Sequence, residues 1–239
     1  MDELTFHRAL YRPGTLLDIG AHDGLLTLPF ADLPGATVQA FEPLPAAFAR
    51  LREAVGARPN VTLHPIALGA AAGEALLEVP SVAGVAQEQW ASLAKDYEAI
   101  RRADPRVDAI ARHPVRVMRL DDLALPGVTG IKLDVEGAEE EAILGGAETI
   151  RAARPAMTIE IEERHRPGST IAVPALLARL GLEGFYALDG AWHPAACFDA
   201  ARLQRASPSP ANFTASDPYV FIFCFVPPER RTELLRLPA

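Results

Sequence analysis

The chain has 239 residues, 49% of them hydrophobic, and a formal net charge of −8 at pH 7. This length and composition predict a single α/β domain, residues 1–239, with a full-sized core. The Lys and Arg residues are scattered rather than clustered, so we expect neither a nucleic acid nor an anionic membrane as a partner.

The N-terminal residues lack the charged and apolar segments of a secretory signal. The longest strongly apolar run, residues 219–226, is too short to cross a bilayer and is expected to be a core strand. Cys197 and Cys224 are far apart and form no C-x-x-C pair. We therefore expect a cytoplasmic protein with reduced cysteines.

Residues 16–24 have the pattern of a buried strand that ends in a tight glycine turn. Asp18 closes this strand, and Gly20 and Gly24 lack a Cβ, so a flat or anionic group could lie directly against the backbone there. A helix is expected over residues 24–33, and Pro29 inside it requires a late start or a kink. Such a unit opens a nucleotide-binding α/β domain with its ligand at the carboxyl end of the strand.

A second strand over residues 36–42 ends at Glu42, which is followed by Pro43. A carboxylate in this position can accept hydrogen bonds from ribose hydroxyls. Pro45 can begin the next helix, and a third strand is expected over residues 61–68. Alternating strands and helices at this spacing predict parallel strands joined by right-handed crossovers.

Residues 81–113 interrupt this alternation and form an insertion that we expect over the ligand edge of the sheet. A helix is predicted from about residue 88 to residue 102, with Trp90, Leu93 and Tyr97 on one face. Two interpretations stay open for it, a lid over the substrate or an amphipathic helix packed on the core.

The charged residues Lys132, Asp134 and Glu136 would share one face of a central strand over residues 130–135. A Lys132–Asp134 ion pair would explain the lysine but not Glu136, whereas a site at the carboxyl edge of the sheet explains both acids. The remaining expected elements are a strand over 115–120, a helix opening at 136–139, a strand over 155–162, a helix over 173–180, a strand over 184–188, a loop with a Ser/Pro cluster over 200–217 and the last strand over 219–226.

The glycine turn lacks the third glycine of a G-x-G-x-x-G fingerprint, which disfavours a dinucleotide. A cofactor without a pyrophosphate, such as S-adenosylmethionine, fits an acidic, glycine-rich turn better. The alternative is that Asp18 and the two glycines form only a tight strand-to-helix connection.

Several motifs in one order resemble the FkbM family of S-adenosylmethionine-dependent methyltransferases. They are DIGAHDG at 18–24, FEP at 41–43, LDDL at 120–123, IKLDVEGAE at 131–139, GGA at 145–147, and RP at 154–155 with Glu160. The resemblance implies a Rossmann-like class I methyltransferase fold, an α/β fold whose mostly parallel seven-stranded sheet has helices on both faces and an antiparallel last strand. It also implies methyl transfer mostly to oxygen on sugars, polyketides or other small metabolites.

We assign the cofactor to residues of the strand ends and the glycine turn. The predicted cofactor-binding set is Asp18, Gly20, Ala21, His22, Gly24, Glu42, Pro43, Ala67 and Asp134. The acceptor is expected to be a small molecule.

Methyl transfer requires alignment of donor and acceptor and removal of the acceptor's proton. Asp134 and Glu160 end neighbouring strands, so their carboxylates either share a raised pKa and provide a base or bind Mg²⁺. Glu136 is a further catalytic candidate. His22 is either a base near the methyl group or a polar turn residue, and His165 is expected to be a solvated surface histidine.

Two other functions stay open from the sequence. One is an NAD(P)-dependent oxidoreductase on the same architecture, and the other is an interaction module without catalysis. A homo-oligomer is also possible.

Overall fold

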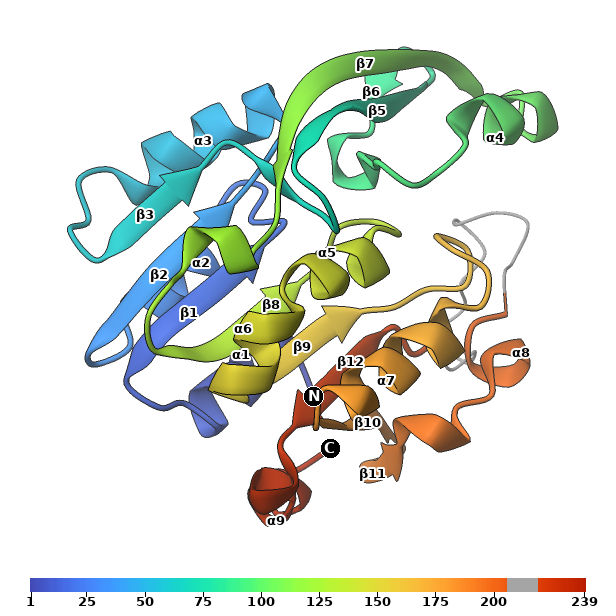
Figure 1. The fold of residues 1–239 in the computed structure, drawn as a ribbon. Helices are drawn as coiled ribbons and strands as arrows, with labels where there is room; N and C mark the ends of the chain where they lie inside the picture. The colour runs from blue at the N-terminus through green and yellow to red at the C-terminus, as the bar shows by residue number, and fades with distance from the viewer. Residues whose placement is uncertain (206–218) are drawn as a thin grey trace.

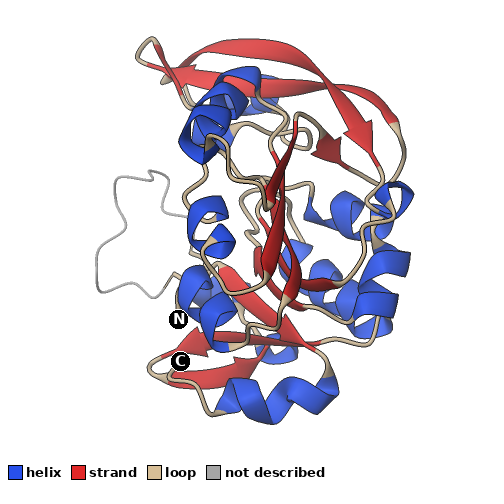
Figure 2. Ribbon diagram, turned by 90° about the vertical axis from the view of Figure 1, so that its left-hand side faces the viewer, coloured by secondary structure: helices blue, strands red, loops and turns tan. Residues whose placement is uncertain are grey.

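The computed structural model describes residues 1–205 and 219–239, so the Ser/Pro cluster expected near residue 208 lies outside the described residues. An eight-stranded sheet carries helices on both faces, and a four-stranded sheet lies beyond one of its edges (Figures 1 and 2). The strands of the large sheet are, in spatial order, β3 (Val61–His64), β2 (Ala36–Phe41), β1 (Gly14–Ile19), β8 (Val128–Leu133), β9 (Ala156–Glu160), β12 (Ile222–Val226), β10 (Glu183–Leu188) and β11 (Ala191–Pro194).

The strand directions confirm the predicted fold class. Strands β3, β2, β1, β8 and β9 pair in parallel, and the last strand, β12, is antiparallel to both β9 and β10. The unexpected strand β11 pairs antiparallel with β10 and gives the sheet its eighth strand. The carboxyl ends of β1, β2, β8 and β9 therefore meet at one edge of the sheet.

The helices around this sheet follow local sequence rules. Pro29 lies in the first turn of α2, where the missing N–H has no carbonyl to bind, so of the two expected outcomes, a late start or a kink, the structure has the late start. Pro45 is the first residue of α3, as predicted. The α-helices are α1 (Glu3–Ala9), α2 (Thr27–Ala31), α3 (Pro45–Val55), α4 (Tyr97–Ala103), α5 (Glu139–Gly145), α6 (Ala147–Ala153), α7 (Ser169–Arg179), α8 (Ala200–Leu203) and α9 (Arg231–Leu235). Among the described residues, no helix has the length and apolar character needed to cross a membrane.

Both faces of the central strands are buried. Leu17 and Ile131 belong to the largest hydrophobic cluster, while Leu16 packs with Phe30 and Val38 in a separate cluster. This burial on two sides is typical of parallel sheets and holds the carboxyl edge in a defined position.

The segment between β3 and β8 contradicts the sequence expectation in two places. The third strand ends at His64, because Pro65 has no N–H to continue the ladder, and residues 67–68 pair in the small sheet instead. The helix expected over residues 88–102 is wrong, since only a 3-10 turn, η1 (Glu88–Trp90), and α4 form there. The small sheet has the order β4 (Ala67–Leu68), β7 (Val107–Met118), β5 (Gly73–Val82) and β6 (Val85–Ala86).

The long strands β5 and β7 pair antiparallel on either side of the segment that contains η1 and α4, so the paired region extends beyond the insertion expected at residues 81–113. Opposite charges face each other across these strands, and Arg112 Nε donates a hydrogen bond of 2.8 Å to Glu78 Oε1. The buried residues Leu77, Val79 and Val115 of these strands form a hydrophobic cluster with Leu44 and Ala47 at the start of α3. Cross-strand pairing and this burial outweigh the helical propensity of the Ala-rich and Glu-rich sequence.

Candidate active site

A cavity of about 600 Å³ lies at the carboxyl ends of β1, β2 and β8. The turns after these strands, the first turn of α1 and the insertion all contribute to its wall. Glu88 and Leu93 of the expected insertion, residues 81–113, line the cavity, while the choice between a lid and a packed segment stays a prediction. The predicted site residues that line the cavity are Asp18, Gly20, Ala21, His22, Glu42, Pro43, Ala67, Asp134 and Glu136, whereas Gly24 and Glu160 do not line it.

The glycines of the turn also serve internal packing, and their role in ligand approach stays a prediction. A Cβ on Gly20 would lie 1.8 Å from the backbone oxygen of Asp134, and Gly20 has a φ of +80°. A Cβ on Gly24 would lie 2.9 Å from Leu51 Cδ1 of α3. The missing side chains thus let the β1 turn contact β8 and α3.

Lys132 joins the turn after β1 to the end of β8. Its Nζ donates a hydrogen bond of 2.6 Å to the carbonyl oxygen of Gly20. The same nitrogen lies 3.7 Å from Asp18 Oδ1 and 3.6 Å from Asp134 Oδ2. Burial disfavours the charged ammonium, but the carboxylates of Asp134 and Asp18 outweigh it and raise the Lys132 pKa. The ion pair considered from the sequence is present. Asp18 is itself buried and accepts a hydrogen bond of 2.5 Å from Thr27 Oγ1.

Glu42 lies at the end of β2, as predicted, and is held by two backbone N–H groups. His22 N donates to its Oε2 at 2.9 Å, and Leu44 N donates to its Oε1 at 2.8 Å. Burial raises the Glu42 pKa, although these two hydrogen bonds lower it. Each carboxylate oxygen keeps a second lone pair for a ligand in the cavity.

The His22 side chain is partly exposed at the cavity wall. Its Nδ1 lies 3.5 Å from Asp23 Oδ1, and its Nε2 lies 3.5 Å from Arg50 Nη2. His22 has a φ of +50°, a conformation that is uncommon outside glycine. His22 is thus a polar residue of the turn after β1, and the alternative role as a base stays a prediction.

Asp134 and Glu136 lie in a turn rather than in a strand, because β8 ends at Leu133. The strict alternation predicted for residues 132–136 is therefore wrong, and Glu136 has a φ of +55°. Glu139 shapes this turn, since its Oε1 accepts hydrogen bonds from Gly137 N at 2.9 Å and Val135 N at 3.3 Å. Asp134 has a partly exposed side chain at the cavity.

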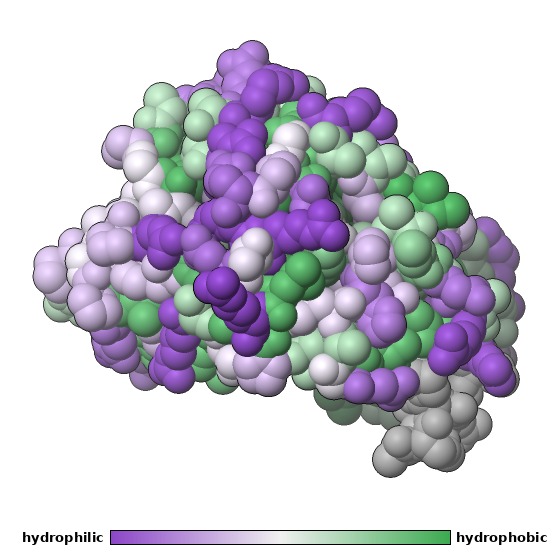
Figure 3. Space-filling view, turned by 90° about the horizontal axis from the view of Figure 1, so that it is seen from below, coloured by the Kyte–Doolittle hydropathy of each residue, from purple (hydrophilic) through white to green (hydrophobic). Residues whose placement is uncertain are grey.

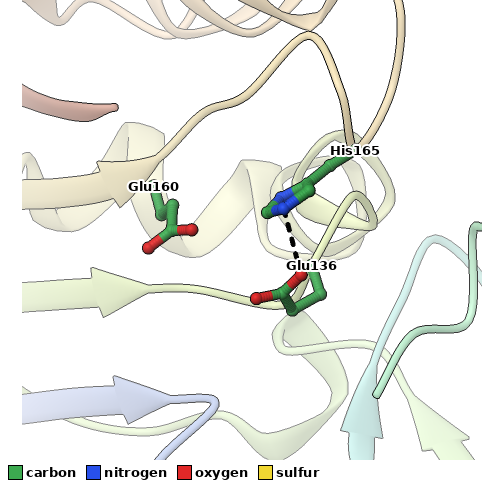
Figure 4. A group of neighbouring side chains, drawn as sticks. All are labelled: Glu136, Glu160 and His165. Carbon is green, nitrogen blue, oxygen red and sulfur yellow. Dashed lines mark ion pairs between the residues drawn. The ribbon is translucent and has the colours of Figure 1, made fainter. Parts of the chain in front are cut away.

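Glu136 connects the cavity to a buried polar cluster (Figure 4). Its Oε2 pairs with Lys95 Nζ of the insertion and lies 3.1 Å from His165 Nε2. Ser92 Oγ donates a hydrogen bond of 2.6 Å to the Glu136 carbonyl oxygen. Burial raises the pKa of Glu136 to about 7, although Lys95 opposes that shift.

Glu160 at the end of β9 faces the same cluster, not the cavity. Burial and the nearby Asp134 carboxylate raise the Glu160 pKa well above its usual range. Ligand atoms of Glu136, Glu160 and His165 lie within 4.8 Å of one another, and Asp134, which we paired with Glu160 for a metal, is outside this group.

His165 is buried, so the expectation of a solvated surface histidine is wrong. Its Nε2 contacts Glu162 Oε1 at 3.2 Å as well as Glu136. Lys95 and His165 were not among the predicted site residues, because they come from an insertion and a loop whose positions depend on the whole fold. The pattern around residues 160–165 is locally only that of an acidic loop.

A family profile described as "Methyltransferase FkbM domain" matches residues 18–183, more than half of the chain. The chain belongs to the FkbM methyltransferase family. The predicted family is thereby confirmed, and the matched range contains the cavity residues from Asp18 to Glu136 and the cluster residues Glu160 and His165.

A curated relative and two solved structures resemble this FkbM-family chain. The "2-O-methyltransferase NoeI" of Sinorhizobium fredii is 32% identical over 152 residues, which cover 58% of this chain and 60% of the relative. The crystal structure of an FkbM methyltransferase from Methylobacillus flagellatus has a TM-score of 0.56 at 14% identity, covering 92% of this chain and 46% of that one. A precorrin-6y C5,15-methyltransferase from Geobacter metallireducens has a TM-score of 0.48 at 15% identity, with coverages of 93% and 85%. The chain therefore spans less than two thirds of the length of NoeI and of the FkbM structure.

The cavity of this FkbM-family chain is strongly acidic. Among the described residues, Lys132 is the one Lys or Arg in the lining, and its ammonium is already bound to Gly20 and flanked by Asp18 and Asp134. The carboxylates in the lining come from Asp2, Glu3, Asp18, Asp23, Glu42, Glu88, Asp134 and Glu136. Such a site attracts a cation and repels a pyrophosphate.

Proposed function

We propose that the protein transfers a methyl group from S-adenosylmethionine to a hydroxyl oxygen of a sugar or another small molecule. The observation that carries this proposal is the acidic cavity at the carboxyl edge of an FkbM-family sheet. When bound, S-adenosylmethionine supplies a methyl group on a positively charged sulfur. The surplus of carboxylates in the lining suits that charge and disfavours the alternative cofactor NAD(P), which carries an anionic pyrophosphate.

The cavity wall offers suitable partners for the other parts of this cofactor. We assign the ribose hydroxyls to Glu42, whose two oxygens are oriented by backbone N–H groups and each keep one lone pair. The apolar residues Phe41, Ile66 and Ala67 also line the cavity and suit the flat adenine ring. Gly20, Gly24 and Asp18 act indirectly in this assignment, because they build the turn.

We assign Asp134 to the reacting end of the cavity. Its carboxylate is partly exposed to the cavity, whereas the Glu136 carboxylate is held by Lys95 and His165 and Glu160 does not line the cavity. In the transfer, the acceptor oxygen forms a bond to the methyl carbon as the carbon–sulfur bond breaks, and the hydroxyl proton must leave. Asp134 accepts that proton in our proposal.

An oxygen acceptor is supported by the relative NoeI, whose name describes a 2-O-methyltransferase. The cavity chemistry agrees, because the surplus of carboxylates in the lining accepts hydrogen bonds from hydroxyls and repels an anionic acceptor. The acceptor class is therefore a neutral or cationic molecule that carries hydroxyl groups.

Calorimetric titration with S-adenosylhomocysteine and, in parallel, with NAD⁺ tests the cofactor. We expect S-adenosylhomocysteine to bind and NAD⁺ to give no heat. Binding of NAD⁺ alone would support the oxidoreductase, and no binding of either compound would support an interaction module. Both outcomes would overturn the proposal.

Replacement of Asp134 by Asn tests the assignment of the base. Methyl transfer from radiolabelled S-adenosylmethionine to a panel of neutral and amino sugars is expected to fall by about 10²-fold or more, the usual contribution of a general base. Asp32→Asn, at an exposed carboxylate paired with Arg58, serves as the control and should keep wild-type turnover. Full turnover by D134N would exclude Asp134 as the base.

A further inference from the structure

The cluster beside the cavity brings together three side chains from separate segments. Glu136 follows β8, Glu160 ends β9 and His165 lies in the loop before α7, and all three point toward a common centre (Figure 4). Their ligand atoms lie within 4.8 Å of one another, and His165 Nε2 is 3.1 Å from Glu136 Oε2.

The His165 ring is an independent sign of a missing ligand. Its side chain is 3% exposed, and its Nδ1 has no hydrogen-bond partner among the described residues. A metal ion binds a neutral imidazole through its unprotonated nitrogen, and Nδ1 can be that nitrogen. Nε2 then keeps its proton and contacts Glu162 Oε1 at 3.2 Å, which is the carboxylate–histidine contact that orients ligating histidines.

We propose that Glu136, Glu160 and His165 form a binding site for one divalent first-row transition-metal ion, of which Mn²⁺ and Zn²⁺ are representatives. One imidazole and two carboxylates suit these ions, whereas Mg²⁺ prefers oxygen ligands and retains several waters. This ligand set differs from the Asp134–Glu160 pair considered for Mg²⁺. The inference does not rest on the proposed methyl transfer.

Lys95 holds the place of a cation in the metal-free protein. Its ammonium pairs with Glu136 Oε2, and both side chains are largely buried. A lysine has a flexible four-carbon stem, so the ammonium can rotate away when an ion binds. Removal of this competing charge should therefore strengthen metal binding.

Isothermal titration of the full-length protein with MnCl₂ and with ZnCl₂ tests the site, with MgCl₂ as the comparison. We expect one Mn²⁺ or Zn²⁺ per chain and weaker binding of Mg²⁺. Glu160→Gln should weaken Mn²⁺ and Zn²⁺ at least about tenfold, since loss of even an outer-shell partner has this effect. Lys95→Met should strengthen the binding of Mn²⁺ and Zn²⁺, because it removes the competing ammonium.

Glu160→Gln is chosen because glutamine has nearly the shape of a protonated glutamate, so the variant is expected to fold. Circular dichroism and S-adenosylhomocysteine binding check this, and Glu74→Gln at an exposed position of β5 is the matched control. No binding to the wild-type protein, or equal affinity of wild type and E160Q, would overturn the metal site. A failure of S-adenosylhomocysteine to bind would instead count against the proposed function.

Discussion

At Gly20 a single missing methyl group allows two strands to meet. A Cβ there would lie 1.8 Å from the Asp134 carbonyl oxygen, and the contact is with backbone, which cannot rotate away. We expect Gly20→Ala to lower the free energy of unfolding by about 3 kcal/mol or more, because steric overlap adds to the cost of a positive φ. Urea denaturation measures this change.

Gly127→Ala is the control that measures the cost of a positive φ without steric overlap. Gly127 has a φ of +61°, but a Cβ there would meet no atom within 4 Å. Its replacement should cost only about 1 kcal/mol. Equal losses in the two variants would show that the contact with Asp134 is not what requires glycine at position 20.

Glu139 predicts a specific dependence of stability on pH. Burial raises its pKa from 4.5 to about 7, although hydrogen bonds from Gly137 and its position at the start of α5 favour the charge. Between these two values the folded chain binds more protons than the unfolded chain, so the free energy of unfolding falls as pH rises and is lowest above the folded pKa.

Glu139→Gln removes this titration and keeps an oxygen for the Gly137 N–H. The stability of the variant relative to wild type should therefore increase by about 1–3 kcal/mol between roughly pH 5 and pH 8. Thermal or urea unfolding at both pH values gives the comparison. A difference that does not change with pH would show that Glu139 stays ionised in the folded protein.

Individual site residues differed in how far the sequence could locate them. Glu42 and Asp134 follow directly from the rule that ligands gather at the carboxyl ends of parallel strands. Lys95 and His165 did not, because their burial beside Glu136 results from the packing of an insertion and a long loop. Such contacts have no periodicity or motif that a single sequence reveals.

Among the elements, the insertion is attached to the site through Ser92. Its Oγ donates to the Glu136 carbonyl oxygen and accepts hydrogen bonds from the N–H groups of Ala94 and Lys95 at 3.0 and 3.1 Å. Ser92→Ala leaves three partly buried groups without this partner, so we expect a loss of about 1–3 kcal/mol. Limited proteolysis between η1 and α4 should become faster as well.

Ser81→Ala in β5 provides the comparison for Ser92→Ala. If both variants are cleaved at the wild-type rate, the hydrogen bonds of Ser92 do not hold the insertion against the site. Mass spectrometry of the fragments locates the cleavage.

The elements themselves were predictable where local rules dominate. The two prolines at 29 and 45 positioned the starts of α2 and α3, and the apolar runs marked the central strands. The insertion was predicted wrongly, because its Ala-rich and Glu-rich sequence favours a helix while long-range pairing of β5 with β7 decides the outcome. The sequence showed that Pro65 interrupts the third strand. It did not show that residues 67–68 pair in the small sheet instead.

At the scale of the molecule, the two ends of the chain pack together. Leu234 of α9 is fully buried in a cluster with Phe6 and Leu10, and Arg230 Nη2 donates to the Leu10 carbonyl oxygen. Leu234→Ala should lower the free energy of unfolding by about 2–5 kcal/mol, as for other buried leucines. The exposed neighbour Leu235 is a matched control, and its replacement by Ala should change stability by less than about 0.5 kcal/mol.

Urea denaturation of both leucine variants compares the two positions. Similar losses would show that the C-terminal helix is not packed against α1 in solution.

Figure 3 shows one face of the molecule, on which hydrophilic residues are mixed with hydrophobic ones outside the grey atoms. The possible homo-oligomer and the single domain stay predictions.

The overall architecture was largely predictable, for two different reasons. Alternating strands and helices indicated a parallel sheet on physical grounds, whereas the antiparallel last strand was implied by the FkbM resemblance alone. Strand β11 and the small sheet were not expected, because short edge strands and inserted hairpins leave weak sequence patterns.

The pairing of β1 with β8 also has a consequence for synthesis of the chain. Gly20 and Lys132, which meet where these strands end, are 112 positions apart. During translation β1 can pair with β2 early, but its other edge stays open until β8 has left the ribosome. This high contact order predicts slow folding and an interval in which the nascent chain depends on chaperones to avoid aggregation.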